Sequence, residues 1–104
     1  MMRADRIQSI VSSARGAGAP IVVLGDGPDA DDLRGALPTC TGTPATVIET
    51  TGTTEGIREA LAAVEDLGTV VLAGPSPDPD PTLDLYGDLH VRGLTIIGAE
   101  APFS

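Results

Sequence analysis

The hydrophobic residues of the chain gather in four short runs, and each run is followed within four residues by a glycine. The runs occupy residues 21–24, 45–48, 70–73 and 94–97. Short and nearly continuous apolar runs are typical of strands that are buried on both faces of a parallel sheet. The pattern therefore predicts four buried strands.

Between the second and third runs, apolar residues recur at helical spacing across residues 55–67. This period predicts an amphipathic helix, with Thr54 as its N-cap and Gly68 as its stop. A strand, a helix and a strand of these lengths form a parallel crossover unit. The centre of the chain is therefore expected to be half of a nucleotide-binding type of fold.

Two further helices and two loops complete the expected organisation. Apolar residues at helical spacing predict a helix over residues 4–15, and residues 31–37 are expected to form a second, short helix. The segment 38–44 is polar and broken by glycine, which favours a loop. Residues 75–81 contain four prolines, so they are expected to form a stiff surface loop.

Length and composition indicate one domain, residues 1–104, with a core of Val, Ile, Leu and Ala, because Tyr86 and Phe103 are the only aromatic residues. Such a core is thin, and dimerisation would strengthen it. Fifteen acidic residues against six basic ones give a net charge of -9. This charge opposes binding to nucleic acid and to an anionic membrane.

One cysteine, Cys40, and one histidine, His90, exclude an internal disulfide and the usual structural zinc sites. We therefore expect no metal. The N-terminal residues lack a long apolar core, so we expect neither a signal peptide nor a membrane span, and a cytoplasmic location.

Three segments resemble the cofactor-binding half of the medium-chain dehydrogenase/reductase family, the zinc-type alcohol dehydrogenases and quinone reductases. They are ATVIETTG at 45–52, LGTVVLAG at 67–74 and LHVRGLTIIG at 89–98. The resemblance covers roughly the C-terminal half of the chain. Members of that family are much longer, so we expect a truncated cofactor-binding half without the catalytic domain.

On the family fold, residues 21–24 could match either the first or the second strand of the cofactor domain. In the sheet order 3-2-1-4-5-6 only the first strand lies beside the fourth. We therefore take residues 21–24 as strand one and infer that strands two and three are absent. The expected fold is a reduced Rossmann-like α/β domain, with about four mostly parallel strands in the spatial order 1-4-5-6, flanked by helices.

The segment GDGPDA, residues 25–30, fits the G-x-G-x-x-A pattern that the resembling family uses to hold the cofactor pyrophosphate through a glycine turn. Four aspartates in residues 26–32 oppose an anionic ligand, and the following helix is short. The acidic residue that holds the ribose is also missing if strands two and three are absent. We therefore expect no cofactor, with NAD(P) as the disfavoured alternative.

The carboxyl ends of parallel strands meet at one edge of a sheet, where functional loops gather. We expect six residues to converge there: Asp26, Glu49, Thr50, Thr51, Ser76 and Glu100. The carboxylates could act as a general acid and base. The alternative, which we favour, is that they are solvated loop acids. The candidate ligand-binding positions are Gly25, Gly27, Thr50, Thr51, Gly74 and Ser76.

His90 and Cys40 are weaker candidates. The unperturbed pKa of histidine lies near neutrality, so His90 is a candidate for proton transfer together with Asp26 and Glu49. It precedes the last strand, however, which predicts a surface position at the opposite edge of the sheet. Cys40 is a candidate nucleophile, but no histidine or lysine stands near it in the sequence, which favours a passive thiol.

The resemblance implies that residues 94–97 form the sheet edge at which two subunits join, so we expect a homodimer. We favour a catalytically incomplete, dehydrogenase-like domain that acts in metabolism as a dimeric small-molecule-binding or accessory protein. It could also pair with a full-length dehydrogenase-like protein through the same edge. The alternatives are a small acid–base enzyme (an isomerase, dehydratase or cyclase) and an NAD(P)-binding oxidoreductase fragment.

Overall fold

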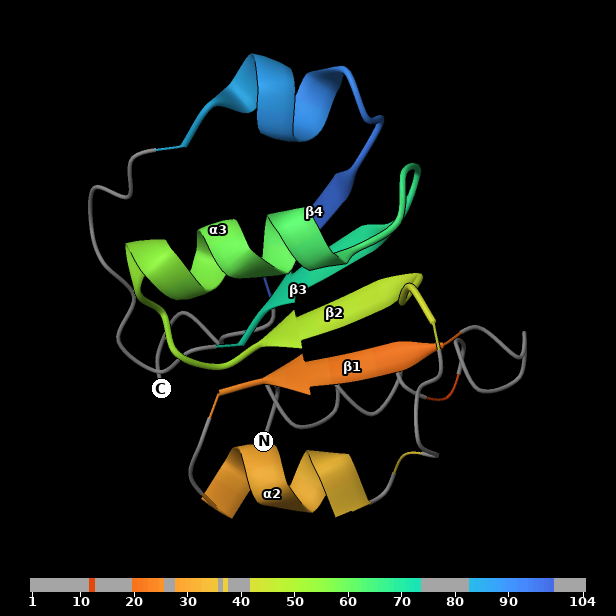
Figure 1. The fold of residues 1–104 in the computed structure, drawn as a ribbon. Coiled ribbons are helices and arrows are strands. Elements are labelled where there is room, and N and C mark those ends of the chain that lie inside the picture. Colours follow the sequence, from red (N-terminus) through yellow and green to blue (C-terminus); the bar gives the residue numbers. More distant parts are fainter. Residues whose placement is uncertain are drawn as a thin grey trace.

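A four-stranded parallel sheet forms the centre of the computed structural model, with helices on both faces (Figure 1). The structure describes residues 12, 20–25, 28–35, 37, 42–73 and 83–98. The strands are β1 (Ile21–Leu24), β2 (Thr46–Glu49), β3 (Thr69–Leu72) and β4 (Thr95–Gly98). They lie in the order β1-β2-β3-β4, and every neighbouring pair is parallel. The predicted α/β fold and strand order are confirmed.

Three strands begin one residue away from their predicted position, and the sheet register explains why. Thr46 pairs with Thr69, and Thr69 pairs with Thr95, so a threonine opens each of these strands. The third run left out Thr69 because threonine is polar, whereas the second and fourth runs already contained Thr46 and Thr95 and began one residue too early, at Ala45 and Leu94. The β-branched side chain of threonine suits extended backbone.

Both described helices start earlier than predicted. Helix α2 spans Pro28–Gly35 rather than residues 31–37, because proline is favoured at the first position of a helix. Helix α3 spans Thr54–Ala63. Its N-cap is Thr53 and not Thr54, because the Thr53 hydroxyl accepts a 2.9 Å hydrogen bond from the Gly56 N–H.

Helix α3 ends at Ala63 instead of continuing to residue 67, and Arg92 holds this end. The Arg92 guanidinium donates to the carbonyl oxygens of Leu61 and Val64, and it forms a 2.8 Å ion pair with Asp66. Beyond the helix, Leu67 has a φ of 65° and donates to the Arg92 carbonyl at 2.9 Å. A partner distant in the sequence therefore sets the end of this helix.

A one-turn π-helix, η1 (Leu85–His90), precedes β4. Nothing in the hydrophobic pattern predicted it. Asp84 caps it by accepting from the Gly87 N–H at 3.0 Å, and Asp88 accepts in turn from the Asp84 N–H at 3.3 Å. Leu89 packs against the same core layer as Ile96, which holds the turn on the sheet.

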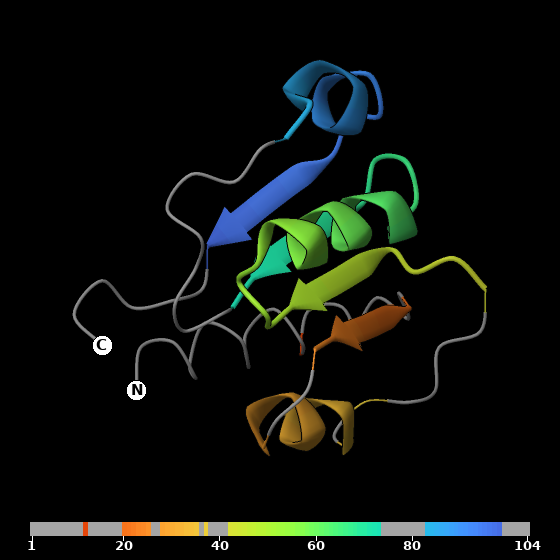
Figure 2. The ribbon, with the colours of Figure 1, turned by 60° about the vertical axis from the view of Figure 1, so that its left-hand side comes forward.

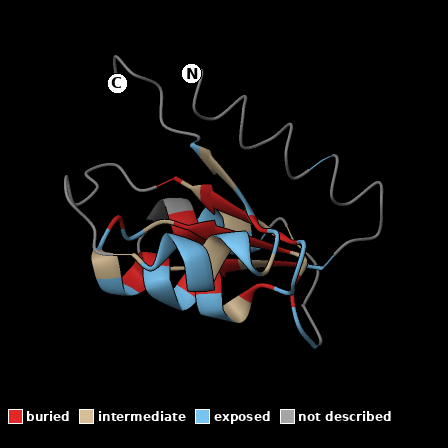
Figure 3. Ribbon diagram, turned by 90° about the horizontal axis from the view of Figure 1, so that it is seen from above, coloured by how far each residue is buried: buried red, intermediate tan, exposed pale blue. Residues whose placement is uncertain are grey.

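The core has two layers, one on each face of the sheet, because successive strand residues point to opposite faces. One layer contains Ile21, Val23, Ala30, Ile48, Val71 and Ala73. The other contains Val47, Ile57, Ala60, Leu61, Val64, Val70 and Leu94. Helix α2 covers the first face, and α3 with η1 covers the second. The predicted Val, Ile, Leu and Ala core is confirmed, and Figure 3 shows these buried positions along the strands and on the inner side of α3.

The two first crossovers of the sheet have opposite hands. The chain steps in one direction from β1 to β2 to β3 (Figures 1 and 2). The side chains of α2 and α3, however, join core layers on opposite faces of the sheet. The β2-α3-β3 unit is right-handed, so β1-α2-β2 is left-handed, whereas about 98% of such connections are right-handed. The connections after β1 and β2 therefore run to opposite faces of the sheet. The carboxyl ends of these two strands thus form a topological switch point.

Several expectations fall on parts of the chain outside the described residues. The helix predicted over residues 4–15 is described only at Ser12, which has helical backbone. The proline loop at 75–81 lies outside them entirely. Residues 42–44 belong to no helix or strand, as predicted for the 38–44 loop.

None of the helices in the described part of the chain is long and apolar enough to cross a membrane.

Candidate functional site

The candidate site lies at the carboxyl ends of β1 and β2, the switch point where doubly wound sheets bind their ligands. Gly25 follows β1, Glu49 ends β2, and Thr50 and Thr51 follow it. Thr50 joins the two strand ends, because its N–H and its hydroxyl both donate to the Leu24 carbonyl, at 3.0 and 2.7 Å. Of the six residues expected to converge, Glu49, Thr50 and Thr51 therefore lie together, beside the candidate ligand-binding residue Gly25.

Glu49 is 0% exposed, so the expectation of a solvated loop acid is wrong for this residue. Its Oε2 accepts a 2.8 Å hydrogen bond from the Thr51 N–H and another from the Thr51 hydroxyl. Its Oε1 accepts from the Gly52 N–H at 3.0 Å. Both carboxylate oxygens are therefore engaged by the turn that leads into α3.

These bonds explain how an acidic side chain is tolerated in the core. A buried carboxylate is costly unless hydrogen-bond donors surround it. Glu49 has two backbone N–H groups and one hydroxyl around it, and it lies near the start of α3, where the helix dipole is positive. The carboxylate therefore fixes the β2–α3 turn, and both of its oxygens accept hydrogen bonds from this turn.

The hydrogen bonds continue from Glu49 into the first turn of α3. The Thr51 hydroxyl donates to Glu49 and accepts from the Thr53 N–H at 3.1 Å. Its oxygen lies 3.0 Å from the Thr53 hydroxyl oxygen, which accepts from the Gly56 N–H. A Cβ on Gly56 would overlap the Thr51 hydroxyl and lie 2.5 Å from Glu49 Oε2. Gly56 is thus needed because the turn packs directly on the helix backbone.

Side chains of the β2–α3 turn also lie directly against Gly25. Its φ of 117° strongly favours glycine. A Cβ at this position would overlap the Thr50 hydroxyl and lie 3.2 Å from the Thr51 methyl group. In the resembling family a glycine here lets the cofactor approach the backbone. In this chain the side chains of Thr50 and Thr51 fill the space beside Gly25.

Arg34 is the cation of the described residues that lies closest to this turn. Its guanidinium donates to the Gly25 carbonyl at 2.7 Å and to the Val23 carbonyl at 3.2 Å, and it pairs with Asp31 at 3.1 Å. These contacts fasten α2 to the end of β1. The guanidinium is thereby engaged by oxygens of the chain, although 46% of the side chain is exposed.

The described residues do not fit a dinucleotide pyrophosphate. Helix α2 begins with Pro28, which has no N–H to donate, and it exposes Asp31 and Asp32. Arg34 is engaged, and Thr50 fills the space beside Gly25. A dinucleotide would meet negative charge and few donors here.

Other predicted site residues lie outside the described ranges, namely Asp26, Gly27, Cys40, Gly74, Ser76 and Glu100. The predicted cluster of carboxylates is thus represented only by Glu49. Among the described residues, no three His, Cys, Asp or Glu side chains are grouped to hold a metal ion.

His90 ends η1 and is exposed, ahead of β4 and away from Glu49, which confirms the predicted surface position at the opposite edge. Its ring stacks on Tyr86, with centroids 5.5 Å apart and planes inclined by 26°.

Sequence reasoning missed two residues that shape this part of the molecule, Thr53 and Gly56. A signal existed for Thr53 and Gly56, because TGTTEG contains a hydroxyl residue three positions before a glycine at a helix start. Arg34 is the basic residue nearest in the sequence to the glycine turn, but the sequence does not show that it binds the backbone carbonyls of Val23 and Gly25.

Comparisons with protein-family models, with curated protein sequences and with solved structures find no match to this chain.

Proposed function

We propose that this chain is a catalytically incomplete, dehydrogenase-like Rossmann domain that acts in metabolism as a dimeric accessory or small-molecule-binding protein and does not use NAD(P). The observation that carries the proposal is the buried Glu49 carboxylate, whose two oxygens are occupied by the β2–α3 turn. A general base needs an oxygen within hydrogen-bond reach of a substrate proton. Glu49 offers its oxygens to the turn instead, which disfavours the acid–base enzyme.

The left-handed β1-α2-β2 crossover supports descent from a larger doubly wound sheet. In the order 3-2-1-4-5-6, the helix after strand one covers the opposite face from the helix between strands four and five. If strands two and three are removed, the chain runs from the first helix straight to strand four. The connection that results is left-handed, as it is here.

The outer edge of β4 supports a dimer through this strand. No described strand pairs with it on that side. Ile96 and Ile97 are both half-buried, and they point to opposite faces. An edge strand with apolar side chains invites another strand. A second copy, or a full-length dehydrogenase-like protein with the same edge, would cover both isoleucines.

The ligand expected at the switch point is uncharged or cationic. Thr51 and Thr53 are exposed there, although their hydroxyls already bind Glu49 and the first turn of α3, and the neighbouring charge is acidic. This environment disfavours phosphates and carboxylates. It suits a small polar molecule that accepts and donates hydrogen bonds.

A calorimetric titration of the purified chain with NADH and NADPH tests the cofactor part of the proposal. We expect no heat of binding, and we expect light scattering on the same sample to give the mass of a dimer. Adenosine is the matched control, because it carries the base and ribose without the pyrophosphate. Micromolar binding of NADH or NADPH would contradict the proposal and restore the oxidoreductase alternative.

A further inference from the structure

Strand β1 lies at one edge of the sheet, and its composition favours pairing with further strands. It reads Ile-Val-Val-Leu from residue 21 to residue 24, without a polar or charged side chain. Among the described residues, no strand pairs with its outer side. An apolar edge of this kind presents unpaired backbone N–H and C=O groups to other chains. Addition of a foreign strand is therefore a hazard at β1.

The register of the sheet identifies the backbone groups of β1 that face outward. The Leu24 carbonyl faces β2, because it accepts a hydrogen bond from the Thr50 N–H at 3.0 Å. Successive residues of a strand direct their backbone N–H and C=O groups to opposite sides. The N–H and C=O groups of Ile21 and Val23 therefore point away from β2.

The Arg34 guanidinium occupies the outward side of this edge. Its Nη2 atom donates to the Val23 carbonyl at 3.2 Å and to the Gly25 carbonyl at 2.7 Å. Its Nη1 atom pairs with Asp31 at 3.1 Å, which orients the planar group. A strand added to β1 would have to donate an N–H to the same Val23 carbonyl. The guanidinium thus stands where a donor of the added strand would stand.

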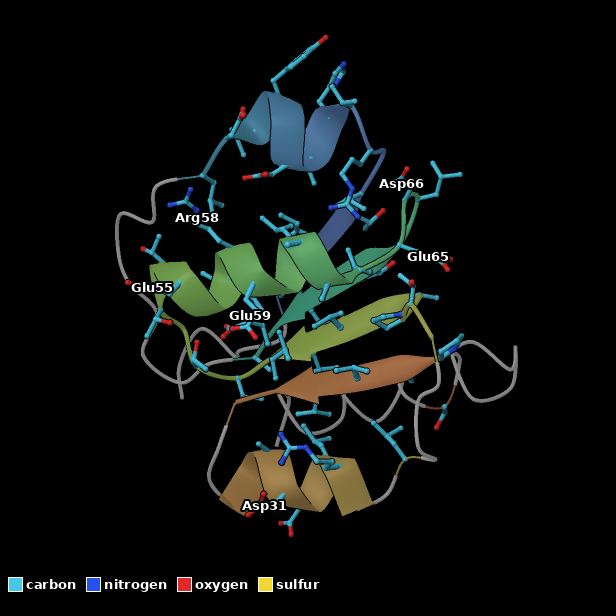
Figure 4. The ribbon with its side chains drawn as sticks, in the orientation of Figure 1. Asp31, Glu55, Arg58, Glu59, Glu65 and Asp66 are labelled. Atoms are coloured by element: carbon cyan, nitrogen blue, oxygen red, sulfur yellow. The ribbon has the colours of Figure 1, made fainter. Side chains whose placement is uncertain are left out.

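Helix α2 places Arg34 at the edge. Ala30 is buried between α2 and the sheet, and Leu33 packs against the same core layer. Arg34 follows Leu33 and lies about 100° farther around the helix, on the flank of the face that covers the sheet. Figure 4 shows α2, which carries Asp31, alongside β1. The packing of the helix therefore brings the arginine to the side of the strand.

We infer that Arg34 makes an autoinhibitory contact that closes the outer edge of β1 to strand addition by another chain. The contact blocks the edge in two ways. It takes the Val23 carbonyl as its own acceptor, and it sets a positive charge at the edge that a second strand would have to displace or bury. The contact involves neither the cofactor nor the dimer of the proposed function, so it stands independently of both.

Sedimentation velocity of the full chain over a range of protein concentrations tests this contact. Arg34→Ala opens the edge. Arg92→Ala is the matched control, because Arg92 also donates to two backbone carbonyls and pairs with an aspartate, but at the end of a helix. Each variant loses one of the six basic residues, so the net charge changes from -9 to -10 in both. The added negative charge opposes association equally in the two variants.

We expect Arg34→Ala to associate at protein concentrations about tenfold lower than the unchanged chain, because a hydrogen bond from a charged donor contributes at least that factor. Arg92→Ala should associate no more than the unchanged chain. Arg34→Gln should lie between the two, since it keeps most of the stem and one neutral donor group. Circular dichroism verifies the fold of each variant, and Arg34→Gln carries the test if Arg34→Ala does not fold.

Amide hydrogen exchange identifies the edge that pairs. In the Arg34 variants, the outward N–H groups of Ile21 and Val23 should become more protected as the protein concentration rises. The N–H of Val22 faces β2 and should not change, which makes it the internal control. Equal association of the Arg34 and Arg92 variants, or association without added protection at Ile21 and Val23, would overturn the inference.

Discussion

The β2–α3 turn and the β4 edge use their interaction groups in opposite ways. At the turn, the Glu49 carboxylate, the threonine hydroxyls and the first N–H groups of α3 bind one another, and the glycines leave no space between the segments. At the edge, half-buried Ile96 and the exposed Tyr86 have apolar surface in contact with water. The polar groups of the turn are satisfied within the chain, whereas the edge keeps apolar side chains exposed to water.

This difference separates structural residues from functional ones in a fold that usually binds at its carboxyl edge. A buried acid at a switch point resembles a catalytic group when only the sequence is considered. Its hydrogen bonds show that it holds the chain in place. The exposed large apolar side chains of the described residues lie elsewhere, on or near η1.

Replacement of Glu49 should have the largest effect on stability. Glu49→Ala removes the acceptor from buried donors and should lower the free energy of unfolding by about 3–5 kcal/mol. Glu49→Gln keeps one acceptor oxygen and should cost about 1–3 kcal/mol. Urea denaturation measures both, with exposed Glu59→Ala as the control. If Glu49→Gln is as stable as the unchanged chain, the structural role of Glu49 is refuted and the acid–base alternative returns.

Gly56→Ala tests the close packing of the turn on α3. Helix propensity alone favours the alanine by about 1 kcal/mol. The new Cβ would overlap the Thr51 hydroxyl, so we expect a net loss of about 2 kcal/mol instead. Gly35→Ala is the matched control, because a Cβ there meets nothing within 4 Å. A gain in stability for Gly56→Ala would show that the turn is looser than described.

Arg92 connects the two regions, since it lies between η1 and β4 and binds the end of α3. Arg92→Ala should lower the free energy of unfolding by about 1.5–2 kcal/mol, because bonds from a charged donor are lost. It should also speed hydrogen exchange in η1 more than in the β2–α3 turn. An equal increase of the exchange rate in both regions would argue against Arg92 as the link. The control Arg58→Ala, at an exposed position, should change the exchange rate in neither region.

Leu67→Asn should have the smallest effect, and in the stabilising direction. Asparagine adopts the left-handed conformation more readily than leucine, so the free energy of unfolding should rise by about 0.5–1 kcal/mol. A thermal melt measures this effect. A loss of stability would show that the contact of the Leu67 side chain with Gly93 outweighs the cost of the left-handed backbone.

The sequence was sufficient for the strands and their order, because buried parallel strands appear as continuous apolar runs and only one register joined them without a gap. It was also sufficient to place Gly25, Glu49, Thr50 and Thr51 at one edge. It did not show that Glu49 is buried, because the donors that solvate it are backbone N–H groups. It missed η1, since a single π-turn has too few residues to show a hydrophobic period.

The central claim is that this domain acts by association at β4 and not by holding a nicotinamide cofactor. Sedimentation velocity of the full chain with NADH tests both parts in one measurement, because NADH can be followed by its own absorbance at wavelengths where the chain does not absorb. We predict a species of twice the 10.5 kDa chain mass at high protein concentration and salt, with NADH left unsedimented. A monomer that carries NADH with it would contradict the account.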